Sequence, residues 1–162
     1  MTALPREPIL RAWERVCAFD EAKTTAVTKQ FLKQQPTLSA YLLACTEALG
    51  AEAGESTVID LTITIWEAMT LANGRRLKMV RPKLIDQAEA ANTKVLEKLE
   101  LASEHEWQET VKQLVYGYNQ RELLTFCMEI LMADDEETPE LAPDRIGLEL
   151  LWLKTIIDCL DQ

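Results

Sequence analysis

The stretch that most constrains the fold is the C-terminal one, residues 144–161, which reads DRIGLELLWLKTIIDCLD. On a helical projection its charged side chains fall within one narrow strip, formed by Arg145, Glu149, Lys154 and Asp158. Apolar residues cover the rest of the circumference: Ile146, Leu148, Leu150, Leu151, Trp152, Leu153, Ile156, Ile157, Cys159 and Leu160. A helix that is apolar on most sides must be buried by several neighbours. We therefore expect a largely buried C-terminal helix at the centre of a helical domain.

Apolar residues recur at spacings of three and four along most of the chain, as in amphipathic helices. Besides the C-terminal stretch, this pattern predicts helices over residues 8–34, 38–49, 82–99, 103–117 and 119–131. The chain has only 5 Gly and 6 Pro, too few turn residues for a many-stranded β-fold. We predict an all-α fold, a single compact domain over residues 1–162 with about seven antiparallel-packed helices around the C-terminal one.

Residues 57–73 carry two conflicting patterns. Apolar and polar residues alternate from Ile59 to Ile65, and the composition is β-branched, as in a strand. The apolar residues then continue at helical spacing, with Ser56 placed to cap a helix and Gly74 placed to end it. No other segment alternates, so a strand here would have no partner. We therefore predict a helix over residues 57–73.

Several polar residues have the spacing of helix caps. Asp20 could cap a second helix within residues 8–34, although we expect that range to form one long helix. Ser103 and Glu106 have the spacing of a capping box. Asn119, three residues before a glutamate, is expected to cap the next helix in the same way.

Composition and cysteine usage are typical of a cytoplasmic globular protein. No uncharged apolar run is long enough to span a bilayer, so no membrane partner is expected. Charges near the N-terminus interrupt any signal-peptide core. The four cysteines are far apart and sit among apolar residues, which favours reduced, buried thiols; they are Cys17, Cys45, Cys127 and Cys159. We therefore expect a cytoplasmic location.

The net charge of −10 is unevenly distributed along the chain. Residues 73–98 carry seven basic and three acidic side chains, whereas residues 99–162 carry four basic and fifteen acidic ones. An acidic protein is repelled at long range by nucleic acid and by anionic membranes. Any anion-binding role must therefore be local.

One stretch could host such a role, the basic loop of residues 75–83. It contains five cations and no acid: Arg75, Arg76, Lys78, Arg81 and Lys83. Clustered Arg side chains can bind phosphate or carboxylate, and the helix that begins at Pro82 would add backbone donors. The alternative, which we favour, is a solvated loop whose cations complement the end of the preceding helix. The loop has no aromatic residue of the kind that single-strand nucleic-acid binding uses.

Two other clusters could bind a metal ion, but neither has a suitable pattern. The acidic segment of residues 134–140 lacks the central glycine of a calcium loop, so a solvated connector is favoured. His105, the only histidine, could share a cation with Glu109 one turn later. It lies in a first helical turn, where the helix dipole disfavours a cation, so we favour a surface histidine. No metal site and no cofactor is predicted.

The four tryptophans lie on four different predicted helices. Core packing is favoured for Trp152 and Trp66, because both lie on strongly apolar helices. For Trp13 and Trp107, which lie on more polar helices, core packing and a role as interface anchor remain open alternatives.

No catalytic residue is predicted, and three functional hypotheses follow. The chain has no glycine-rich phosphate loop, no zinc-ligand spacing and no nucleophile paired locally with His105. We favour a non-enzymatic adaptor or regulatory protein that acts through a protein partner or through self-association as a homo-oligomer. The second hypothesis is anion or nucleic-acid binding through residues 75–83. The third is an enzyme or small-ligand receptor with a pocket between helices.

Overall fold

The computed structural model describes residues 1–48, 57–74, 76–100, 103–133 and 143–162. Over these ranges the chain forms eight helices and no strand, so the predicted all-α fold is confirmed. The helices are α1 (Arg6–Cys17), α2 (Glu21–Gln34), α3 (Pro36–Ala48), α4 (Thr57–Asn73), α5 (Pro82–Glu100), α6 (Glu104–Gly117), α7 (Arg121–Leu131) and α8 (Pro143–Leu160). None of the helices in the described part is long and apolar enough to cross a bilayer.

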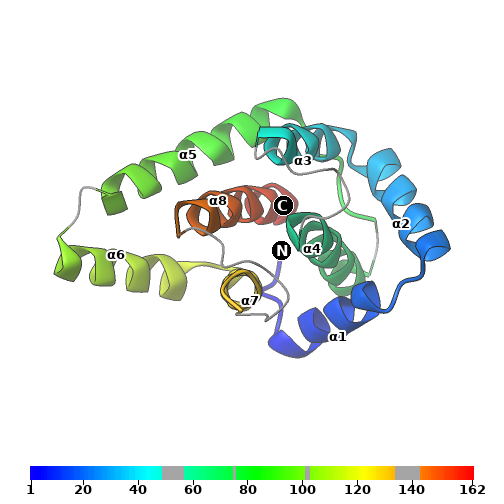
Figure 1. Cartoon of the computed structure of the whole chain (residues 1–162), viewed down its shortest axis with the longest axis horizontal. Coiled ribbons are helices and arrows are strands. Elements are labelled where there is room, and N and C mark those ends of the chain that lie inside the picture. Colours follow the sequence, from blue (N-terminus) through cyan, green and yellow to red (C-terminus); the bar gives the residue numbers. More distant parts are fainter. Residues whose placement is uncertain (49–56, 75, 101–102, 134–142) are drawn as a thin grey trace.

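Two helices, α4 and α8, lie in the interior, and the other six surround them (Figure 1). Helix α8 contacts α3, α4, α5 and α7, and helix α4 contacts α1, α2, α7 and α8. No residue of α8 from Arg145 to Leu160 is exposed. The prediction of a largely buried C-terminal helix is therefore confirmed, but α4 shares the central place with it.

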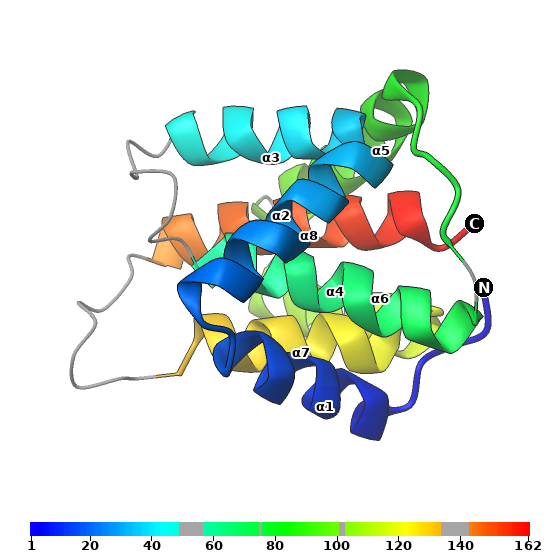
Figure 2. The same cartoon turned by 90° about the vertical axis from the view of Figure 1, so that its right-hand side faces the viewer.

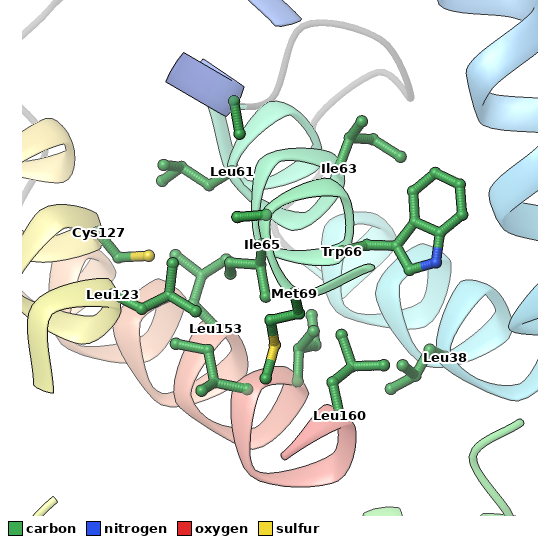
Figure 3. Close-up of a cluster of buried hydrophobic side chains, with 14 of the residues drawn as sticks. Leu38, Leu61, Ile63, Ile65, Trp66, Met69, Leu123, Cys127, Leu153 and Leu160 are labelled. Atoms are coloured by element: carbon green, nitrogen blue, oxygen red, sulfur yellow. The ribbon is translucent and has the colours of Figure 1, made fainter. Parts of the chain in front are cut away.

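The core lies between this interior pair and the helices around it. Figure 3 shows Ile65 and Met69 of α4 facing Leu153 of α8, with Leu123 on the α7 side and Leu38 on the α3 side. All five residues are fully buried. Burial of apolar surface contributes about 25 cal/mol per Å², so this shared cluster is a main source of stability.

The whole of residues 57–73 is helical, as predicted, although the composition suits a strand. Thr62 and Thr64 are fully buried in α4. Each hydroxyl donates a hydrogen bond to the backbone carbonyl four residues earlier, at 2.7 and 2.8 Å respectively. The helix therefore satisfies these two buried hydroxyls itself, and they need no partner strand. Ser56, the predicted cap of this helix, lies outside the described residues.

Residues 8–34 form two helices, so the prediction of one long helix was wrong. Helix α1 ends at Cys17, and α2 begins four residues later. The Asp20 carboxylate accepts a hydrogen bond from the Lys23 amide at 2.7 Å. This N-cap pairs one of the amides that a helix start leaves without a partner, which stabilises a break at this point.

Two of the other predicted helix ends are confirmed and one is wrong. Ser103 and Glu106 form the predicted capping box at the start of α6. Gly74 has a φ of 62°, the left-handed conformation that glycine favours, and ends α4 as predicted. Asn119 does not cap α7, because the N-cap residue is Gln120, which makes no side-chain cap bond. The Asn119 side chain makes a tertiary contact instead.

Three of the four tryptophan side chains have a defined place. Trp66 and Trp152 are buried, as predicted. Trp13 is half-buried and packs edge-to-face on Phe126, with ring centroids 5.8 Å apart. Core packing is therefore the alternative that fits Trp13. The side chain of Trp107 lies outside the described part of the chain.

The cysteines are free thiols, and three of them are buried as predicted: Cys45, Cys127 and Cys159. Cys17 is exposed, which corrects the prediction, because it is the last residue of α1 and no further turn covers it. Burial raises the thiol pKa of Cys127 and of Cys159 to about 12. These two thiols are therefore protonated at neutral pH and are poor nucleophiles.

Candidate functional site

The basic loop crosses from the end of α4 to the start of α5. Figure 2 shows it running along the end of the molecule at which both chain termini lie. Arg75 lies outside the described residues, so we define the basic strap as residues 76–83. Its four cations are all exposed: Arg76, Lys78, Arg81 and Lys83. None of the four forms an ion pair with a residue of the described ranges.

Two apolar side chains and one glutamine anchor the backbone of the strap. Leu77 and Val80 are buried in the core. Gln35, which lies between α2 and α3, is 0% exposed. Its Nε2 donates to the Lys78 carbonyl at 2.9 Å, and its Oε1 accepts from the Val80 amide at 3.0 Å. The glutamine amide thus pairs with the strap as a neighbouring backbone would, and the four cationic side chains remain in water.

The same contact brings the last turn of α2 beside the strap. Leu32 and Lys33, on that turn, are exposed, and Met79 of the strap is 60% exposed. Met79 therefore adds an apolar side chain to the basic strap, and Leu32 and Lys33 are exposed on the turn of α2 that leads to Gln35. Nothing local in the sequence indicates this arrangement, because it depends on a pairing between Gln35 and residues 43 and 45 positions away.

The chemistry of this surface is that of binding. Its side chains are cations with hydrogen-bond donors but no acceptor, together with exposed aliphatic groups. It contains no carboxylate, imidazole or thiol that could act as a base or nucleophile. Such a surface complements a negatively charged ligand that carries some apolar area.

A second polar cluster lies inside the molecule, where α5, the end of α6 and α8 meet. The Asp158 carboxylate accepts hydrogen bonds from Asn92 at 2.9 Å and from the Tyr118 hydroxyl at 2.6 Å. Lys154 Nζ donates to Asp158 and to Asn92 Oδ1, both at 2.8 Å. Asn92 also donates to Thr155 at 3.1 Å, and Lys154 Nζ lies 4.5 Å from the centre of the Tyr118 ring.

This internal cluster joins helices and is saturated with mutual contacts. Burial, and then the Asp158 charge, raise the pKa of Tyr118, so the phenol remains a donor. Lys154 and Asp158 belong to the charged strip of α8 that the sequence predicts, but their partners on other helices were not predicted. This part of the strip faces α5 and the end of α6.

A third cluster holds the segment after α8. The Asp161 carboxylate accepts from Asn119 at 2.7 Å and from Gln120 at 2.8 Å, and it lies 3.0 Å from the amino group of Met1. Burial alone would raise the pKa of Asp161, but these donors outweigh it and lower the pKa below its ordinary value. This contact explains why Asn119 is not available as a helix cap.

The two predicted alternatives for metal binding have different outcomes. His105 is exposed, as predicted. Glu109 pairs with Lys112 at 3.1 Å and is thus engaged with a cation of the chain itself. The acidic segment of residues 134–140 lies outside the described residues. Within the described ranges, no group of three or more His, Cys, Asp or Glu side chains could hold a metal ion.

Comparison with known proteins finds no relative. The chain matches no protein-family model, no curated protein and no solved structure. A functional hypothesis must therefore be built on the geometry and charge of the basic strap.

Proposed function

We propose that this protein is a non-enzymatic adaptor or regulatory protein that binds an acidic segment of a partner protein. The proposed binding surface is the basic strap together with Leu32 and Lys33 of α2. The observation that supports this proposal is the combination of an anchored backbone with four exposed cations that form no ion pair within the described ranges, on a chain whose net charge is −10.

An anchored backbone favours binding because fewer degrees of freedom are lost when a partner docks. The Gln35 hydrogen bonds and the burial of Leu77 and Val80 hold the strap before any partner arrives. Complementary charge then speeds association and selects the partner, while exposed apolar groups such as Met79 contribute affinity once water is excluded. The cations on the strap are thus presented in a fixed arrangement.

An acidic protein segment fits this surface better than a nucleic acid does. The acidic excess elsewhere on the chain repels a long polyanion, whereas a short acidic peptide can bind the strap alone. The strap also offers Met79 but no aromatic ring on which a base could stack. Inorganic anions would bind the cations of the strap but would make no contact with apolar groups such as Met79.

The proposal can be tested with a fluorescent peptide of alternating glutamate and leucine residues and with a labelled single-stranded oligonucleotide. The variant Arg76→Glu/Lys78→Glu should bind the peptide at least about tenfold more weakly than the wild type, since charge-assisted hydrogen bonds are lost. Lys94→Glu/Lys98→Glu, two exposed lysines of α5, is the matched control with the same change in net charge. Fluorescence anisotropy at two salt concentrations measures both.

Two outcomes would contradict the proposal, and a third would concern self-association. Equal affinity of both double variants for the peptide would show that only net charge matters. Tighter binding of the oligonucleotide than of the peptide would support the nucleic-acid hypothesis instead. Light scattering that shows a stable oligomer in the wild type and in the strap variant alike would place self-association on another surface.

A further inference from the structure

A cleft with about 290 Å³ of empty space, part of it open to solvent, lies where the end of α1 meets the first halves of α2 and α4. Its walls are mainly apolar and include Phe19, Ile59 and Ile63. Three polar side chains also line it: Asp60 of α4, and Thr24 and Thr28 of α2. Because that space includes open solvent, the enclosed part of the cleft has room for only one small group.

Asp60 differs from the other carboxylates that face neighbouring helices. Its carboxylate makes no hydrogen bond and no ion pair with any residue of the described ranges. Asp158 and Asp161, by contrast, each have several donors. The Asp60 side chain is exposed, but its apolar neighbours remove part of its hydration and raise its pKa. A cation placed in the cleft would relieve this cost.

The cleft is bounded by a helix that is weakly embedded. Of the 14 residues of α2, only Val27 and Phe31 are buried. Further along the same helices, Gln34 Oε1 of α2 and Trp66 Nε1 of α4 are buried without a hydrogen-bond partner among the described residues. Helix α2 therefore has little packing that would oppose a small widening of the cleft.

The rim of the cleft already attracts an ammonium group. Lys23 Nζ lies 5.8 Å from the centre of the Phe19 ring, within the range of a cation–π contact. Phe19 thus contributes a surface that favours cations, in addition to the negative charge of Asp60.

We propose that this cleft binds a primary alkylammonium group, the chemistry shared by a lysine side chain and by small aliphatic amines. The methylene chain would lie against Ile59 and Ile63, as the stems of lysines do on apolar surfaces. The ammonium would donate to the Asp60 carboxylate and to the Thr28 hydroxyl. This site is separate from the basic strap and does not depend on the function proposed for it.

The test is an NMR titration that follows the methyl resonances of Ile59 and Ile63. The probes are n-butylammonium and, as its neutral counterpart, 1-butanol. The amine should shift both residues and bind about tenfold more tightly than the alcohol, because only the amine pairs with Asp60. Asp60→Asn should reduce the affinity for the amine by about the same factor and leave that for the alcohol unchanged. Asp86→Asn, an exposed aspartate of α5, is the control.

A third probe, Nα-acetyl-lysine N-methylamide, distinguishes the two sources of the group. Tighter binding of this probe than of n-butylammonium assigns the cleft to a partner's lysine, and the reverse assigns it to a free amine. Equal affinity for amine and alcohol, or no shift of Ile59 and Ile63, would overturn the proposal. The amine–alcohol comparison uses the wild type, so it holds even if Asp60→Asn fails to fold.

Discussion

The two interior helices satisfy their polar groups in different ways. Helix α4 buries Thr62 and Thr64, whose hydroxyls donate to carbonyls of the same helix. Helix α8 carries Lys154 and Asp158, which pair with each other and also with side chains of α5 and of the segment that follows α6. Thr62 and Thr64 therefore have their hydrogen bonds before α4 packs, whereas Lys154 and Asp158 gain most of theirs only after α8 packs.

This difference gives the two helices different roles in specifying the fold. Hydroxyls that are hydrogen-bonded within their own helix require no particular partner, so around Thr62 and Thr64 helix α4 can pack through shape and apolar area alone. A helix with a buried polar strip pays a desolvation penalty unless particular partners are in place. We infer that Asn92 and Tyr118 fix the positions of α5 and the end of α6 against α8, whereas α4 supplies mainly apolar area.

The largest effect is expected where α8 meets the shared apolar core. Leu153 is fully buried, so Leu153→Asp would place an unpaired carboxylate among apolar side chains. We expect a loss of more than about 4 kcal/mol in the free energy of unfolding, enough to unfold the domain. Thermal unfolding followed by circular dichroism measures it. Leu71→Asp, at an α4 position that is 58% exposed, is the control and should melt like the wild type.

A cooperatively melting Leu153→Asp variant would contradict the buried position of this face of α8. Loss of cooperative melting in Leu71→Asp as well would show that the exposed end of α4 is covered in solution, for example by a second copy of the chain. The first result would assign an exposed surface to α8, and the second would remove one from α4.

A smaller effect should separate the two kinds of polar contact directly. Asp158→Ala removes the acceptor of Asn92, Lys154 and Tyr118 together. Because the Asp158 side chain is still 24% exposed, water can replace part of this loss, and we expect a cost of about 2 kcal/mol. Thr64→Val on α4 removes one local hydroxyl and should cost about 1 kcal/mol or less. Urea denaturation of both variants gives the comparison.

Equal costs for Asp158→Ala and Thr64→Val would contradict the distinction between locally and remotely satisfied helices. A useful further readout is Lys154→Met, which keeps the length of the side chain but removes its charge. Its cost should resemble that of Asp158→Ala, since it also leaves members of the network without a partner.

The same distinction explains how much of the fold could be predicted from sequence. Helices are local, so periodicity identified residues 57–73 as a helix in spite of their strand-like composition. The Asp20 cap was also visible, but sequence alone could not decide whether the apolar pattern continued through it. The decision depended on tertiary packing, because α1 and α2 lie against different sides of α4.

For the binding surface, the sequence showed the charged residues but not the residues that pack around them. The cluster from Arg76 to Lys83 is contiguous and needs no fold to be recognised. The role of Gln35 requires that the start of α3 lie beside the strap, and the position of Asp60 in a cleft requires that α2 lie across α4. These are contacts between distant residues, which the spacing of residue types along the chain does not encode.

The smallest expected effect concerns two carboxylates with opposite pKa shifts, one on α4 and one beyond α8. Burial raises the pKa of Asp60, so the folded state binds its proton more tightly than the unfolded state does. Stability therefore falls as the pH rises from about 4 through the folded pKa of Asp60. For Asp161, burial is outweighed by the donors from Asn119 and Gln120, and the pKa is lowered. Its contribution is present above about pH 4 and is lost as the pH falls through the folded pKa.

The two substitutions should therefore change stability in opposite directions at pH 7. Asp60→Asn should raise the free energy of unfolding, because the ionised carboxylate is disfavoured in the cleft, and this gain should vanish as the pH falls towards about 4. Asp161→Asn should lower it, and the deficit should shrink below about pH 4. Urea denaturation of both variants from pH 7 to pH 3 measures these differences. Loss of stability in both variants at pH 7 would mean that the Asp60 carboxylate accepts a hydrogen bond in solution. The carboxylate on α4 would then be paired with another group, as the Asp158 carboxylate on α8 is.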